Sequence, residues 1–239
     1  GLDAAIKSTV DAGLSYFELG LNHVEPANLS REAIREWRIK TPLAEFEKVR
    51  RKFADGGVVI TGYSYPFRKD YTDAEFARGF EITRALGASV LTTTTNPSLV
   101  PKLSPLADKY KIKVGLHNHS RIREDEFATP DDFLNAIKNA SPLVGINLDA
   151  GHFSAAGFDP LEFTKQHYKR IYSIHLKDRK KNQGPDMPFG QGETPIKEIL
   201  LLLKTKGYPI PAMIEWEPKN VDPVAGVRQC ADYCKKVLG

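Results

Sequence analysis

Four residues that can bind a metal ion or move a proton stand at the ends of four strand-like segments in the second half of the chain. These residues are His117, Asp149, His175 and Glu215. They close the segments 113–119, 145–152, 172–178 and 212–217. Their separations of 32, 26 and 40 residues are close to the roughly 30 residues of one βα unit. Consecutive strands therefore deliver polar groups to matching ends, which is how a β/α barrel builds an active site.

Two carboxylates and two imidazoles form a ligand set suited to a divalent cation. Such a mixed set favours Mn²⁺, Co²⁺, Fe²⁺, Ni²⁺ or Zn²⁺ over Ca²⁺. A buried carboxylate would also be costly without a cationic partner. Each residue alone is more often a helix cap, a turn residue or a hydrogen-bonded core histidine, so the prediction depends on four of them at equivalent strand ends. We predict one divalent metal ion, Mn²⁺, Co²⁺, Zn²⁺, Fe²⁺, Ni²⁺ or Mg²⁺.

Strand alternation assigns roles to neighbouring side chains, because every second residue points to the same face. His119 shares a face with His117, Lys177 with His175, and Glu217 with Glu215. The predicted catalytic groups are Glu215, His117, His119 and Lys177. The predicted substrate contacts are His152, Glu217, Asn118 and Trp216. For Trp216, which points away from Glu215, packing between barrel and helices is the more ordinary role. Asp178 faces away from Lys177, and we expect it to support the site as a hydrogen-bond acceptor.

The composition is that of an ordinary globular protein with 239 residues, a common length for one (β/α)₈ domain. No apolar run approaches the roughly 20 residues that span a bilayer. The formal net charge of +4 permits an anionic substrate, whereas a nucleic-acid-binding domain usually shows a denser basic stripe. We therefore expect a small-molecule substrate, with neither nucleic acid nor membrane as a partner.

Helices and strands alternate along the whole chain, which predicts a single α/β barrel domain over residues 1–239. Helices are predicted at 2–13, 41–54, 72–86, 99–110, 129–139, 159–167, 194–206 and 224–237. Three further strands are predicted at 16–20, 58–61 and 89–93, which makes seven in all. The chain begins with a helix, so we expect that the first barrel strand is missing upstream; a barrel closed by seven strands is the alternative.

Several features stay open at this point. The glycine-rich loop 184–193 follows the His175 strand and is a candidate lid or substrate loop. Glu18, His23 and Tyr63 on the early strands are candidate contacts, although a structural role is the more ordinary expectation for each. Helices on the barrel exterior would permit a homodimer. The compartment is unknown, cytoplasmic by default, because an incomplete N-terminus would hide a signal peptide.

The strings NLDAGH (147–152), HLKD (175–178), FGQGE (189–193) and GYPIPAMIEWE (207–217) resemble the later strand ends and loop of the xylose-isomerase-like barrel superfamily. That superfamily includes sugar-phosphate isomerases and epimerases, keto-sugar epimerases, inosose dehydratase and endonuclease IV. In its epimerases, Glu, Asp, His and Glu from four strands hold one divalent metal. Asp149, His175 and Glu215 match the last three ligands. His117 stands where those epimerases carry the first Glu.

The resemblance implies a metal-dependent sugar or keto-sugar isomerase or epimerase. Its reaction would remove a proton α to a carbonyl and pass through a metal-stabilised enediolate. A His-x-His at this strand end also resembles the dehydratase branch. The alternative is therefore a dehydratase or lyase that performs β-elimination on a keto-sugar or 3-keto-glycoside with the same site. A DNA-repair endonuclease is less well supported, because the stretch Asp186-Met187-Pro188 lacks the histidine that endonuclease IV carries there. A sugar-binding barrel without catalysis is a further alternative.

Overall fold

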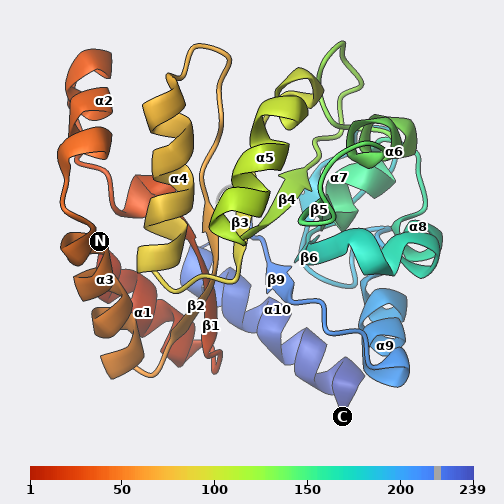
Figure 1. Ribbon diagram of the computed structural model, residues 1–239. Coiled ribbons are helices and arrows are strands. Elements are labelled where there is room, and N and C mark those ends of the chain that lie inside the picture. Colours follow the sequence, from red (N-terminus) through yellow and green to blue (C-terminus); the bar gives the residue numbers. More distant parts are fainter. Residues whose placement is uncertain (218–221) are drawn as a thin grey trace.

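A computed structural model describes residues 1–217 and 222–239, and its centre is a parallel sheet of seven strands (Figure 1). Each strand pairs with the next one along the chain, in the order β1-β2-β3-β4-β5-β6-β9. The strands are β1 (Tyr16–Gly20), β2 (Val59–Ser64), β3 (Val90–Thr93), β4 (Lys113–His117), β5 (Val144–Asp149), β6 (Ile171–Leu176) and β9 (Ala212–Ile214). All seven coincide with predicted strands, so the predicted α/β barrel architecture is confirmed.

Helices cover the outside of this sheet (Figure 1). They are α1 (Leu2–Asp11), α2 (Arg31–Lys40), α3 (Leu43–Asp55), α4 (Asp73–Ala85), α5 (Val100–Tyr110), α6 (Pro130–Ile137), α7 (Ala150–Ala155), α8 (Pro160–His167), α9 (Ile196–Lys206) and α10 (Pro223–Leu238). Among the described residues, none of these helices is both long and apolar enough to cross a membrane.

The prediction of eight helices was wrong, because α2 and α7 were missed. Six of the ten residues of α2 are charged, and its apolar residues Ile34 and Trp37 are only partly buried, so its short apolar stripe is easily overlooked in the sequence. Ser30 nevertheless caps it by accepting a hydrogen bond from the Ala33 amide at 3.2 Å. Helix α7 has only six residues and begins directly after the strand-end residue Asp149, where a turn was expected.

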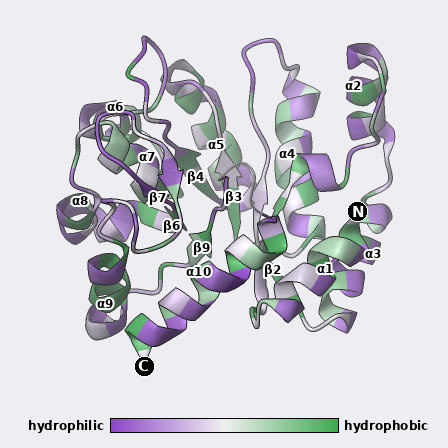
Figure 2. Cartoon of the chain, turned by 180° about the vertical axis from the view of Figure 1, so that it is seen from behind, coloured by the Kyte–Doolittle hydropathy of each residue, from purple (hydrophilic) through white to green (hydrophobic). Residues whose placement is uncertain are grey.

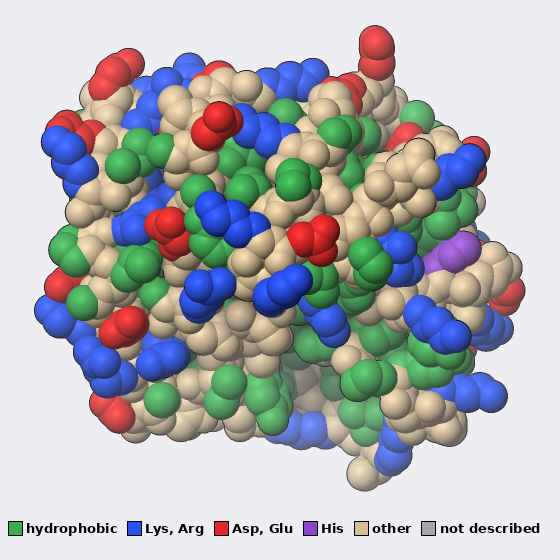
Figure 3. All heavy atoms as spheres, viewed as in Figure 1, with side chains coloured by type: hydrophobic (Ala, Val, Ile, Leu, Met, Phe, Trp, Pro, Cys, Tyr) green, Lys and Arg blue, Asp and Glu red, His purple; other side chains and the backbone are tan. Residues whose placement is uncertain are grey.

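The core lies between the strands and the helices that cover them. Strand β5 is buried at every position, as expected for a parallel strand that is covered on both faces. The helices carry hydrophilic and hydrophobic stretches side by side, with one face turned to the sheet (Figure 2). On the face seen in Figure 3, acidic and basic side chains are interspersed.

Strands β1 and β9 are the two edges of the sheet, and a groove of about 550 Å³ lies between them. Phe17 and Glu18 line it on one side, and Met213 and Ile214 line it on the other. The expectation of one more strand, upstream of the first helix, stays a prediction. The groove matters for the site because it reaches Glu215 and His175 from the side.

The start of α4 is a capping box formed by Thr72 and Glu75. Thr72 Oγ1 accepts from the Glu75 amide at 3.3 Å, and Glu75 Oε2 accepts from the Thr72 amide at 2.9 Å. Thr72→Ala should lower the free energy of unfolding by about 1 kcal/mol, because one amide of the first turn loses its acceptor. Urea unfolding followed by circular dichroism measures this. Thr72→Ser keeps the oxygen and should stay close to the wild type; an equal loss in both variants would contradict the capping role.

Candidate metal centre

The ends of four parallel strands bring the four predicted ligands together. His117 and Asp149 are the last residues of β4 and β5, His175 lies near the end of β6, and Glu215 directly follows β9. The ladder sets Asp149 opposite His175, and His175 opposite Met213. One ligand atom from each of the four residues lies within 4.8 Å of the others. The cluster therefore depends on the register of the parallel strands. The same register explains why the four ligands are separated in the sequence by about one βα unit each.

The separations between the ligand atoms suit a single divalent ion. His117 Nε2 lies 3.6 Å from Asp149 Oδ2 and 3.9 Å from Glu215 Oε2. His175 Nδ1 lies 2.8 Å from Glu215 Oε2. Ligand atoms bound at about 2.1 Å to one tetrahedral or octahedral ion would be roughly 3–3.5 Å apart when adjacent. The observed separations bracket that range.

Unpartnered polar atoms in the cluster also fit a cation. Three buried atoms of the cluster make no hydrogen bond: both ring nitrogens of His117 and Oδ2 of Asp149. Buried polar atoms in native proteins are normally paired, because an unpaired one costs about 1–3 kcal/mol. The other oxygen of Asp149, Oδ1, accepts from the His152 amide at 2.7 Å and so caps α7. Asp149 is thereby held by one oxygen, while the other makes no hydrogen bond and has Lys177 Nζ 3.2 Å away.

The two carboxylates are ionised despite their burial. Burial alone would raise the pKa of Asp149, but the Lys177 ammonium and the His117 imidazole hold it well below its usual value. Burial would likewise raise the pKa of Glu215, but the hydrogen bond and charge of His175 lower it to about 2. Both groups therefore carry negative charge across the neutral range, which is the state that a metal ligand needs.

Lys177 is the positive charge at the centre of the site. Its Nζ lies 3.2 Å from Asp149 Oδ2, 3.2 Å from Glu215 Oε1 and 2.8 Å from Glu217 Oε2. The side chain is buried, and burial would lower the pKa of Lys177, but these carboxylates raise it above its usual value. Strand alternation had placed Lys177 and Glu217 on the site side, and the structure brings both of them there.

Two further imidazoles lie next to the cluster. His152 Nε2 is 3.1 Å from Lys177 Nζ, and its Nδ1 is 2.8 Å from an Arg179 guanidinium nitrogen. Burial lowers the pKa of His152 to about 4, with the Lys177 charge acting in the same direction. Burial and the neighbouring His117 lower the pKa of His119. The two rings lie 5.6 Å apart between centroids, so two neutral imidazoles line this side of the site.

Two predicted substrate contacts lie elsewhere. Asn118 is fully buried, and its amide clamps the main chain of Asp149: Oδ1 accepts from the Asp149 amide at 2.9 Å, and Nδ2 donates to the Asp149 carbonyl at 3.2 Å. It therefore positions a ligand instead of reaching the cavity. The Trp216 ring packs so closely on Gly226 of α10 that no Cβ would fit there. Trp216 lines the groove between β1 and β9, which agrees with its packing role and not with a substrate contact in the cavity.

The glycine-rich loop 184–193 is tied down by Asp178. This carboxylate accepts hydrogen bonds from the amides of Gly190 at 2.8 Å, Gly192 at 2.9 Å and Thr194 at 3.2 Å. Asp178 is therefore the supporting acceptor that alternation predicted. The loop also contains β8 (Asp186–Met187), which pairs antiparallel with β7 (Asp178–Arg179). The amides of Gly190 and Gly192 are thus already occupied by Asp178, and the role of the loop as a lid or substrate loop stays a prediction.

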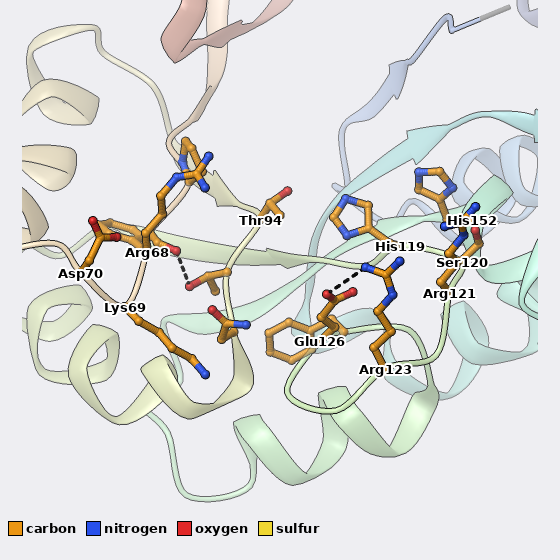
Figure 4. Close-up of a pocket in the computed structure, with 15 residues that line it drawn as sticks. Arg68, Lys69, Asp70, Thr94, His119, Ser120, Arg121, Arg123, Glu126 and His152 are labelled. Atoms are coloured by element: carbon orange, nitrogen blue, oxygen red, sulfur yellow. Dashed lines mark hydrogen bonds and ion pairs between the residues drawn. The ribbon is translucent and has the colours of Figure 1, made fainter. Parts of the chain in front are cut away.

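Two adjoining cavities connect the cluster to the outside. The inner one, about 190 Å³, contains the side chains of His117, His175 and Glu215. The outer one, about 660 Å³, shares Thr94, His119 and His152 with it. Figure 4 shows Arg68 on one side of the outer cavity, and His119, His152 and Arg121 on the other side.

Sequence reasoning missed two groups that contact the predicted site. Glu18 on β1 was expected to be structural, but its Oε2 lies 3.1 Å from His175 Nε2. Arg179 bridges His152 and Ser120, with the guanidinium 3.0 Å from Ser120 Oγ. Glu18 could have been found as a carboxylate near the end of an early strand, whereas no local signal marks Arg179.

Residues 6–237 match the family of xylose isomerase-like TIM barrels, and the chain belongs to that family. It is similar to the L-ribulose-5-phosphate 3-epimerase UlaE of Escherichia coli, with 32% identity over 96 residues, which is 40% of this chain and 34% of UlaE. It is also similar to an uncharacterized protein of Methanocaldococcus jannaschii, with 31% identity over 130 residues, 53% of this chain and 43% of that protein. The matches thus span less than half of each curated relative.

Solved structures share the fold at low sequence identity. A probable 3-DHS dehydratase, AsbF, of Bacillus anthracis has a TM-score of 0.76 at 14% identity, covering 98% of this chain and 93% of that one. The IOLI protein, crystallised with a zinc atom, has a TM-score of 0.74 at 17% identity over 100% and 93%. An L-ribulose 3-epimerase has a TM-score of 0.72 at 17% identity over 99% and 88%. Epimerases and a dehydratase therefore stand among the proteins with this fold.

The cluster predicts how ligand variants change metal binding. After loading with Mn²⁺ or Zn²⁺ and gel filtration, the wild type should retain about one ion per chain, measured by plasma mass spectrometry. His117→Ala and Asp149→Ala should each weaken binding by more than the roughly 10–100-fold typical of residues outside the ligand set. His167→Ala is the control, because that ring lies against Phe163 in α8, with the two planes tilted, and is outside the cluster. Full affinity in His117→Ala would remove His117 from the ligand set.

Proposed function

We propose that this protein is a divalent-metal-dependent isomerase or epimerase of a sugar or keto-sugar. The observation that carries the proposal is the cluster of His117, Asp149, His175 and Glu215, which shares one cavity with further acid and base groups. The proposal gains support from the family and from the epimerases among its relatives. The cluster lies at the carboxyl ends of the barrel strands, where enzymes of this architecture carry their active sites.

Glu215 is our candidate for the base that removes the proton α to the substrate carbonyl. A bound divalent ion would supply a Lewis acid for that carbonyl. Glu215 is ionised at neutral pH, since its pKa lies at about 2, and its side chain is 30% exposed toward the cavity. Lys177, fixed between Glu215 and Glu217, would place an ammonium near the negative charge that develops on the substrate oxygen.

Epimerisation also needs a group that returns the proton to the opposite face. No carboxylate stands at position 117, so we assign this second role to His119. It lines both cavities, and its lowered pKa makes it a neutral imidazole that can accept and return a proton near neutral pH. His152 would then be a substrate contact, held by Arg179.

β-Elimination is the second candidate, and the imidazole at position 117 favours it. A lyase or dehydratase needs one base for the α-proton and then expels a β-leaving group, so a second carboxylate on the opposite face is unnecessary. Glu215 supplies the same first step in both reactions. Keto-sugars and 3-keto-glycosides would be its substrates.

We further propose that the outer cavity binds an anionic part of the substrate, a phosphate or a carboxylate. Arg68 and Arg121 line this cavity and have no carboxylate partner among the described residues. A guanidinium binds either anion through paired hydrogen bonds. The other two cations at the rim are already paired, Lys69 with Asp125 at 2.6 Å and Arg123 with Glu126 at 3.5 Å.

The two reaction outcomes separate in heavy water. Metal-loaded protein is incubated in D₂O with keto-sugars, inosose and 3-keto-glucosides, and the products are followed by NMR. An epimerase would place deuterium on the α-carbon of an intact sugar, whereas a lyase would release an unsaturated product or an aglycone. Glu215→Gln should lower either rate by about 10²–10⁴. No exchange with any of these substrates would count against enolisation chemistry.

The arginines at the rim predict a preference for charged substrates. Arg121→Ala should raise KM for a phosphorylated keto-sugar about 10-fold or more and leave KM for the neutral sugar unchanged, because one charge-assisted contact contributes about 1.5–3 kcal/mol. Arg123→Ala is the matched control, since Glu126 already pairs with it. If the wild type shows equal kcat/KM for both sugars, the outer cavity does not select an anion.

A further inference from the structure

His175 lies between two carboxylates that approach different ring nitrogens. Nδ1 is 2.8 Å from Glu215 Oε2, inside the ligand cluster. Nε2 is 3.1 Å from Glu18 Oε2, on the opposite side of the ring. Nδ1 is therefore the nitrogen that faces the other ligands, and Nε2 is turned toward β1. The two side chains are well shielded, with 12% of His175 and 13% of Glu18 exposed.

Glu18 reaches His175 because three strands shape its path. Glu18 on β1 pairs in the ladder with Gly62 on β2. A Cβ at position 62 would lie 3.1 Å from both Cγ and Oε2 of Glu18, so glycine leaves the space that the side chain occupies. Beyond it, Thr92 on β3 donates from Oγ1 to Glu18 Oε1 at 2.8 Å. One oxygen of Glu18 is thus anchored within the sheet and the other is presented to His175.

We propose that Glu18 is a positioning residue for the metal centre: it accepts the Nε2 proton of His175 and thereby reserves Nδ1 for the ion. An imidazole that binds a metal through one nitrogen carries its proton on the other, and a carboxylate on that N–H fixes the tautomer and the ring orientation. This inference rests on the metal centre of the proposed function. It adds a residue that contacts neither metal nor substrate.

A second polar side chain adjoins the same nitrogen of His175. Asn147 lies at the same nitrogen, with its amide nitrogen 3.1 Å from His175 Nε2 and its Oδ1 buried without a partner. Rotating the amide by 180° would place Oδ1 on Nε2–H as a second acceptor. Both neighbours then favour a proton on Nε2.

Metal affinity, measured by competition with a chromophoric chelator for Zn²⁺ and Co²⁺, tests the proposal without any substrate. Glu18→Ala should weaken binding by about 10–100-fold. Glu18→Gln should weaken it less, because an amide oxygen still accepts a hydrogen bond. Thr92→Val should cause an intermediate loss, since it frees the anchored oxygen. Thr61→Val is the control, because its hydroxyl contacts the Phe17 carbonyl on β1 and not Glu18.

A spectroscopic reading separates positioning from general loosening. In the Zn²⁺-loaded wild type, ¹⁵N NMR of the imidazoles should show His175 protonated at Nε2 and metal-bound at Nδ1, and Glu18→Ala should broaden or shift the Nε2 proton signal. The proposal is overturned if Glu18→Ala folds, binds both ions as tightly as the wild type and keeps that signal. If Glu18→Ala does not fold, unchanged affinity in Glu18→Gln and Thr92→Val overturns it. A wild type that binds no ion would instead refute the metal centre itself.

Discussion

Negative charge at the end of the barrel is the constraint around which the site is arranged. Asp149 is completely buried, and an unpaired buried carboxylate would cost several kcal/mol. The Lys177 ammonium neutralises part of this negative charge from within the cluster. The imidazoles of His117 and His175, which lie on neighbouring strands, also contact the carboxylates. Yet Asp149 Oδ2 still has no hydrogen bond. A divalent ion would neutralise the negative charge that these side chains leave. The buried carboxylates would then be the common cause of the electrostatics of the fold and of the proposed chemistry.

Main-chain architecture makes that arrangement rigid. Parallel register brings the strand-end residues to the same end of the barrel, with His117 opposite Asn147 and Asp149 opposite His175. Asn118 then fixes the Asp149 main chain with two hydrogen bonds. Capping of α7 takes Asp149 Oδ1, so the carboxylate cannot rotate its free oxygen away from the cluster without losing a helix cap. A second carboxylate, Asp178, restrains the loop that follows β6 in the same way. Ligand geometry is thus set by contacts to the backbone. The Asn118 contacts would stay in place when a ligand is substituted, whereas the cap of α7 would be lost together with the Asp149 carboxylate.

The sequence predicts those parts of the architecture that depend on the two-residue alternation of strands and on the length of βα units. Strand alternation placed Lys177 beside His175, and βα spacing brought His117 and Asp149 to equivalent ends. Contacts that cross the barrel carry no such signal. Glu18 reaches a histidine 157 positions away, and its path depends on a glycine in a neighbouring strand, so only the tertiary structure reveals it. Asn118 sits on a strand end like a ligand, but the pairing of β4 with β5 turns its amide to the main chain.

The histidine at position 117 changes the charge of the site as well as its bases. The resemblance to the family's epimerases implies that they hold their ion with three carboxylates and one imidazole, which leaves a net charge of −1 around a divalent ion. Here two carboxylates and two neutral imidazoles would leave the loaded cluster neutral, with Lys177 balanced by Glu217. A neutral cluster repels an enediolate less and so stabilises it more. The same replacement removes a carboxylate base from one face of the substrate. In the proposed reaction, the site would then be better equipped to form an enediolate than to reprotonate it from the opposite side, where His119 is the candidate acid. Elimination of a β-leaving group would therefore compete with epimerisation as the fate of that intermediate.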